Sequence, residues 1–257
     1  HFNANSGAVH IAVDVPQGAD LAEARIVASN AVFETQGIME FPKGRSGSID
    51  KTVAEIRLDE GSVVKAKGWR KVTLQAVKIL FNGGAVQTRG WNGGQSYFAA
   101  ASNNGSVFSL EATNGCPVSV AVGHSLSSLF GVSSRSAVIE VCGDGDFLVS
   151  GANLVRLATT SYWNDNIRFR NSGALRISNP NAYIEFSGFF RDTENSPAKD
   201  IVIENGGRLD IRECEALAKS LVLMGSGTVT NTETGVSTLT LGVGNGDSVF
   251  PANCRRA

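Results

Sequence analysis

The sequence is poor in charge: residues of both signs make up only 18% of its 257 positions. Typical soluble domains carry about a quarter. Aromatic residues reach 7%, and there are 6 prolines and 2 methionines. In contrast, hydrophobic residues make up 42% and glycine occurs 29 times. This composition argues against a helical bundle and against a disordered chain, and it favours many short strands joined by tight turns.

The chain also lacks a basic excess, because its formal net charge is −1 and its pI is about 6.4. Nucleic-acid-binding domains usually carry a basic patch or stripe, so we expect no nucleic-acid partner. No apolar run approaches the ~20 residues that span a bilayer, and we expect no membrane insertion. The first residue is His1 and not methionine. We therefore expect a processed or truncated start from which any export signal has been removed.

The four cysteines form no CxxC motif and have no neighbouring histidine, which argues against a zinc site. They are Cys116, Cys142, Cys214 and Cys254. The even number permits disulfides in three pairings, of which Cys116 with Cys142 and Cys214 with Cys254 join the nearest neighbours in sequence. Alternatively, the first three are small apolar residues of the core.

The first 50 residues differ in pattern from the rest. Ala8 to Val15 alternates like a strand and ends at Pro16; its residues are Ala8, Val9, His10, Ile11, Ala12, Val13, Asp14 and Val15. Ala19 to Phe33 has a broad apolar face at helical spacing and acids near its start, which predicts a helix. A pair of short strands is the alternative. We expect residues 1–50 to form a strand-and-helix cap and residues 51–257 to form the main body.

From about Val53 onward, short apolar–polar alternations are each closed by small or turn-forming residues. Five segments share a plan of two strands around such a turn: 107–120, 137–150, 174–187, 201–212 and 221–232. A repeat of 20–30 residues that varies through loop length predicts an all-β, parallel β-helix. Alternate residues, such as Ile201 with Ile203 and Leu209 with Ile211, should point inward. A β-sandwich is the structural alternative.

Residues 223–250 resemble the autotransporter-associated β-strand repeat of bacterial surface and secreted proteins. The matching parts are GSGTVTN at 225–231, STLTLG at 237–242 and DSVF at 247–250. The resemblance implies a right-handed β-helix in an exported protein, usually as a passive stalk or passenger. Pro251 and Cys254 stand where the family continues into another coil. A missing next coil or a terminal cap is implied there.

Several polar clusters are candidates for catalytic groups, because β-helices include polysaccharide lyases and glycosidases. Paired carboxylates occur at Asp144 with Asp146 and at Asp192 with Glu194, both in turn- or loop-like contexts; Asp200, Arg208, Asp210 and Arg212 form a further charged set. Turns and solvated cross-strand pairs explain these residues as well as catalysis does. No GxSxG or nucleotide-binding glycine motif is present. We assign no catalytic residue and expect no metal or other cofactor.

Scattered aromatic residues in turns offer a surface for sugars: Trp69, Trp91, Tyr97, Trp163, Phe189 and Phe190. The favoured function is an extracellular structural or adhesive element that self-associates into a filament or stalk. The strand at residues 8–15 would serve strand exchange between copies. The alternatives are a polysaccharide-active β-helix, as a lyase or tailspike-like depolymerase, and a module that binds surface glycans.

Overall fold

The structure is a computed structural model, and the described residues form an all-β protein. They are residues 2–4, 9–10, 25–28, 32–35, 39–41, 53–66, 72–74, 76–88, 98–100, 107–122, 129–132, 138–157, 167–184, 197–212, 215–244 and 246–249. Within these ranges every ladder between two strands is parallel.

The largest sheet has ten strands, with β1 and β25 at its two edges. In order, they are β1 (Phe2–Ala4), β4 (Val32–Thr35), β7 (Val63–Ala66), β10 (Ala85–Thr88), β13 (Val118–Val122), β16 (Phe147–Gly151), β19 (Leu175–Ile177), β21 (Lys199–Ile203), β23 (Glu215–Leu223) and β25 (Thr238–Thr240).

Four smaller sheets accompany it. The six-stranded sheet contains β18 (Ile167–Phe169), β15 (Val138–Gly143), β12 (Val107–Ala112), β9 (Ala76–Asn82), β6 (Val53–Asp59) and β3 (Arg25–Ala28). The four-stranded sheet contains β17 (Val155–Arg156), β20 (Ala182–Ile184), β22 (Arg208–Ile211) and β24 (Thr228–Thr230). The remaining strands are β2 (Val9–His10), β5 (Met39–Phe41) and β8 (Val72–Leu74) in one sheet, and β11 (Phe98–Ala100) and β14 (Phe130–Val132) in another.

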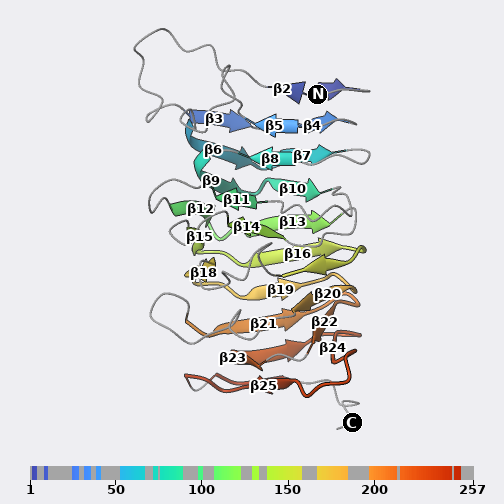
Figure 1. The fold of residues 1–257 in the computed structure, drawn as a ribbon. Coiled ribbons are helices and arrows are strands. Elements are labelled where there is room, and N and C mark those ends of the chain that lie inside the picture. The colour runs from blue at the N-terminus through green and yellow to red at the C-terminus, as the bar shows by residue number, and fades with distance from the viewer. Residues whose placement is uncertain are drawn as a thin grey trace.

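Strands that are distant in sequence lie side by side because each pass of the chain adds a layer (Figure 1). Ala85 is opposite Ser119, 34 positions later, whereas Ile201 is opposite Leu221, only 20 positions later. β2 and β25 lie at opposite ends of the stack (Figure 1). The predicted variable period of 20–30 residues is therefore close to the observed one. The period shows no steady trend along the chain, because Val63 is opposite Ala85, only 22 positions later.

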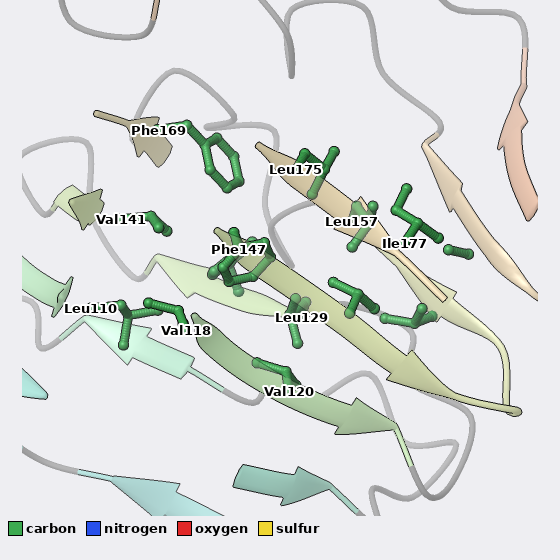
Figure 2. Packing of buried hydrophobic residues seen from close by; sticks show 14 of the residues in the cluster. Leu110, Val118, Val120, Leu129, Val141, Phe147, Leu157, Phe169, Leu175 and Ile177 are labelled. Carbon is green, nitrogen blue, oxygen red and sulfur yellow. The ribbon is translucent and has the colours of Figure 1, made fainter. Parts of the chain in front are cut away.

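The core runs through the interior of the stack and is built from alternate strand residues. The predicted inward positions are confirmed: Ile201 and Ile203 are 0% exposed, and Ile211 is 2% exposed. Figure 2 shows buried side chains from several strands converging on this interior. At its centre the ring of Phe147 lies 5.5 Å from that of Phe169, between ring centroids. Because each layer buries the apolar residues of the next, no layer could be stable alone.

The prediction of a helix at Ala19 to Phe33 is wrong. β3 and β4 occupy part of this segment, with Ile26 opposite Ile56 and Phe33 opposite Val64. The alternative of two short strands is what the structure contains. The β-branched residues here lose side-chain freedom in a helix and pack well in a sheet. Strands of residues 1–50 pair directly with strands beyond residue 50, so the parallel stack continues across this position.

All five two-strand segments are confirmed, but their turns belong to two different edges of the stack. The turns at 113–117 and 144–146 connect the six-stranded sheet to the ten-stranded sheet. Those at 178–181, 204–207 and 224–227 connect the ten-stranded sheet to the four-stranded sheet. The true counterpart of segment 137–150 is therefore residues 167–177, where β18 and β19 stack on β15 and β16.

Two buried asparagines hold these turns together. Asn171 is 1% exposed, and its Nδ2 donates to the carbonyl oxygens of Gly145, 3.0 Å away, and Gly173, 3.1 Å away. Asn179 is 0% exposed and donates to the carbonyl oxygens of Ser150 and Asn153. Each amide thus satisfies turn carbonyls that the parallel ladders leave unpaired.

Candidate functional sites at the sheet ends and on strand β22

At the N-terminal end of the stack, the outermost described strands have a described partner on one side only. β1 is the outermost strand of the ten-stranded sheet, and β2 is the outermost strand of the three-stranded sheet. Of the strand expected at residues 8–15, only Val9 and His10 are described, as β2. This strand pairs with β5 in the three-stranded sheet. It keeps one open edge, because among the described strands nothing pairs with its other side.

The C-terminal end presents an open apolar interior as well as strand edges. β25 and β24 are the outermost strands of their sheets. Leu239 and Leu241 pack against the core but stay partly exposed, whereas Ala216, opposite Leu239 in the preceding layer, is 1% exposed. Val236 is 87% exposed and Val249 is 57% exposed near the same end. The last described layer therefore leaves apolar surface that another layer would cover.

The edge strands β1, β24 and β25 carry none of the charged residues that commonly block strand addition, whereas β3, the edge strand of the six-stranded sheet, contains Arg25. β1 reads Phe-Asn-Ala, β24 reads Thr-Val-Thr and β25 reads Thr-Leu-Thr. Natural proteins usually protect such edges with Lys, Pro, bulges or inward charges, because an unprotected edge recruits other strands. Both ends of the ten-stranded sheet are therefore chemically able to accept a further parallel strand.

The cysteines that the structure describes are both free thiols. Cys116 and Cys142 are half-buried, so the pairing between them is not formed here. Burial and the nearby carboxylates of Glu111 and Glu140 raise the pKa of Cys142 to about 11. Its thiol therefore stays protonated near neutral pH and is a poor nucleophile. Cys214 and Cys254 lie outside the described residues, and pairings that involve them stay predictions.

The first carboxylate pair considered for catalysis makes structural contacts. Asp144 is exposed in a turn and accepts a hydrogen bond from the backbone N–H of Gly115, 3.0 Å away. Asp146 accepts from Arg176 Nε at 2.7 Å, and the same guanidinium donates to Glu204 at 2.9 Å. These contacts bind one layer to the next. Asp192, Glu194 and the six aromatic residues proposed for sugar contact lie outside the described residues.

Of the four charged residues considered for catalysis, Arg208 and Asp210 lie on β22 and Arg212 directly follows it, whereas Asp200 lies on β21 of the ten-stranded sheet. Leu209 is 0% exposed and points into the core, so its neighbours Arg208 and Asp210 point to the opposite face of the strand. Asp210 is nevertheless only 1% exposed. Its carboxylate accepts from Arg212 Nε at 2.9 Å and from both the N–H and the hydroxyl of Thr232, at 3.0 and 2.6 Å.

The shared face of this set was predictable from its spacing, but the burial of Asp210 was not. Residue 232 lies 22 positions beyond the carboxylate, and no local pattern connects the two. Tyr183 was also missed: its ring lies 4.1 Å from the guanidinium carbon of Arg212, measured to the ring centroid. This cation–π contact depends on the register of β20 against β22, which places Tyr183 opposite Asp210.

We expect Asp210 to make the stability of the protein depend on pH. Burial alone would raise the pKa of this carboxyl, but the hydrogen bonds from Thr232 and the Arg212 guanidinium outweigh burial and lower it. A lowered pKa in the folded state stabilises the protein above the unfolded value of about 3.9. That contribution is lost as pH falls through the folded pKa.

The variant Asp210→Asn should be less stable at pH 7 and should show a shallower loss of stability below about pH 4. Urea titrations at several pH values measure both effects. Asp144→Asn is the matched control, because that carboxylate is exposed and should change little. Identical pH profiles for wild type and Asp210→Asn would contradict the argument.

Other kinds of site find little support in the described part of the chain. It contains no group of three or more His, Cys, Asp or Glu side chains arranged to hold a metal ion. It also contains no helix that could cross a membrane. No protein-family model, no curated protein and no solved structure matches the chain. The surfaces of the chain itself are therefore the guide to its function.

Proposed function

We propose that the chain is a right-handed parallel β-helix that acts outside the cytoplasm as a structural or adhesive element, with copies joined end to end. The observation that carries the proposal is the pair of open stack ends. The C-terminal end leaves Leu239 and Leu241 partly exposed, and the two edge strands of the ten-stranded sheet, β1 and β25, contain no charged residue.

The polarity of the strands favours a second copy as the occupant of each end. β1 and β25 lie at opposite edges of one wholly parallel sheet. The N-terminal edge of one copy could therefore continue the ladder at the C-terminal edge of another with the strand direction preserved. Such an interface joins two different surfaces and does not close on itself, which is the geometry of an open filament.

Placing a charge inside the joint should prevent assembly. In Leu239→Lys the ammonium group can reach water in an isolated copy, so the fold should survive. Assembly would bury the charge without a partner, which costs more than the ~1.4 kcal/mol that corresponds to a tenfold change in association. We expect the assembled fraction to fall at least about tenfold, measured by light scattering and negative-stain microscopy.

The matched control is Gln87→Lys, which adds the same charge at an exposed position of β10, in the interior of the same sheet. This variant should assemble like wild type. Far-UV circular dichroism establishes that both variants keep their β content. A wild-type protein that stays monomeric at high concentration would refute the proposal. Normal assembly of Leu239→Lys would exclude the C-terminal end as the joint.

A further inference from the structure

The face of the four-stranded sheet that points away from the core carries rows of polar side chains. Arg156, Tyr183, Asp210 and Thr230 form one row across the four strands, each opposite the next. In the preceding row Arg208 is opposite Thr228. Arg208 is the first residue of β22, and Arg212 directly follows the last. The two arginines are four positions apart, which separates their Cα atoms by about 13 Å along an extended chain. This face is distinct from the stack ends used for assembly.

Arg208 has no carboxylate partner among the described residues, unlike the four arginines of the described ion pairs. Arg57, Arg170, Arg176 and Arg212 each form an ion pair. Arg208 is half-buried, and its one side-chain hydrogen bond, from Nη2 to Asn181 Oδ1, is long at 3.4 Å. Its Nε is buried and donates to no acceptor. A half-buried guanidinium without a counter-charge is costly unless an anion binds it.

The surroundings of Arg208 suit an acidic sugar. Thr228 is exposed beside it, so its hydroxyl can donate to or accept from a ligand hydroxyl. The free edge of a guanidinium matches a carboxylate through two parallel N–H donors. The net charge of −1 argues against a nucleic-acid ligand. The outward side chains described around Arg208 are polar, and so lack the apolar residues that enter a lipid surface.

We propose that Arg208 binds the acidic group of an anionic polysaccharide lying across the four-stranded sheet, with Thr228 contacting a neighbouring hydroxyl. The polymer would pass from Arg208 toward Arg212, whose guanidinium is held over Tyr183 and lies 3.8 Å from the half-exposed Glu233. The inference does not depend on end-to-end association, and it can hold if the assembly proposal fails.

The test measures binding of polygalacturonate, chondroitin sulfate and neutral dextran to the full chain by biolayer interferometry at low salt. We expect both anionic polymers, or the carboxylated one alone, to bind and dextran not to bind. Single-stranded DNA is included, and equal binding of DNA would overturn the assignment to sugars. Arg208→Gln should weaken binding about tenfold or more. Arg208→Lys should recover part of the affinity, because it keeps the charge and loses the paired donors.

Arg170→Gln is the matched control, because Arg170 is exposed next to β18 and pairs with Glu140. It removes the same charge from a different sheet and should leave binding unchanged. A purely structural Arg208 predicts the opposite result, in which Arg208→Gln lowers the melting temperature and leaves binding intact. Failure of the wild type to bind either anionic polymer, or equal losses in Arg208→Gln and Arg170→Gln, would overturn the proposal.

Discussion

Replacing Gly143 by alanine is expected to reduce the free energy of unfolding by about 4 kcal/mol or more, a loss large enough to prevent folding in a marginally stable chain. Gly143 ends β15 with a φ of 95°, where an L side chain is strained by about 1–2 kcal/mol. A Cβ atom there would also overlap the carbonyl oxygen of Ala112 and lie 2.8 Å from its carbonyl carbon. Both atoms belong to the backbone of the adjacent layer, which cannot move without breaking its own ladder.

Gly115→Ala separates the two contributions to this loss. Gly115 has a φ of 69° in the turn of the preceding layer, but an added Cβ would meet nothing within 4 Å. We expect it to cost only the backbone strain, about 1–2 kcal/mol. Unfolding titrations with guanidinium chloride measure the free energy of unfolding of both variants. Equal losses would show that strain alone acts at Gly143, and that the layers are not packed as closely as the structure has them.

Periodicity predicted the strands and their inward residues, but not which turns stack on each other. The turn around Asn114 stacks on the turn around Asp144, as expected from the repeat. The turn around Asn179 belongs to another edge of the stack, although its flanking strands look the same in sequence. Local alternation identifies a strand, whereas the partner of a strand is set by packing between layers.

The same limit explains the helix predicted at residues 19–33. Apolar residues in that segment fit a helical stripe, and acids stand near its start. Ile26 nevertheless pairs with Ile56, and Phe33 pairs with Val64, in ladders that continue the main stack. A segment that can complete parallel ladders gains backbone hydrogen bonds and packing from the layer beside it, which override a weak local propensity.

The candidate sites also combine features that one strand predicts with features that the next layer determines. The alternation on β22 predicted that Arg208, Asp210 and Arg212 share a face, and the ion pair between the last two residues agrees. From the sequence alone, solvated charge pairs are the simpler interpretation of these residues. Asp210 is instead buried by Thr232 and its turn, whereas Arg208 has no carboxylate partner in the part of the chain that the structure describes. Such differences depend on the next layer and cannot be found in a single strand.

Phe147→Ala is expected to lower the free energy of unfolding by about 3–5 kcal/mol. Phe147 is 0% exposed and is among the largest fully buried side chains of the described core. Its ring lies 6.0 Å from the ring of Phe130 and 5.5 Å from that of Phe169, which is edge-on to it (Figure 2 labels Phe147 and Phe169). Truncation removes these contacts and leaves a cavity between strands of three different sheets, β14, β16 and β18, which cannot collapse together.

Phe147→Leu tests whether volume or the aromatic cluster dominates. Leucine refills much of the space, so packing alone predicts a loss of less than about 1.5 kcal/mol. Edge-on aromatic contacts stabilise a protein by about 0.5–1.5 kcal/mol beyond the effect of buried apolar area. Loss of the aromatic cluster therefore adds at most a similar amount to the loss of stability in Phe147→Leu. Unfolding by guanidinium chloride measures the free energy of unfolding of both variants. Because parallel layers support only their neighbours, hydrogen exchange should lose protection first at Val120 and Ile177, in the strands on either side of β16. A uniform loss along the whole stack would instead mean that the layers unfold as one cooperative unit.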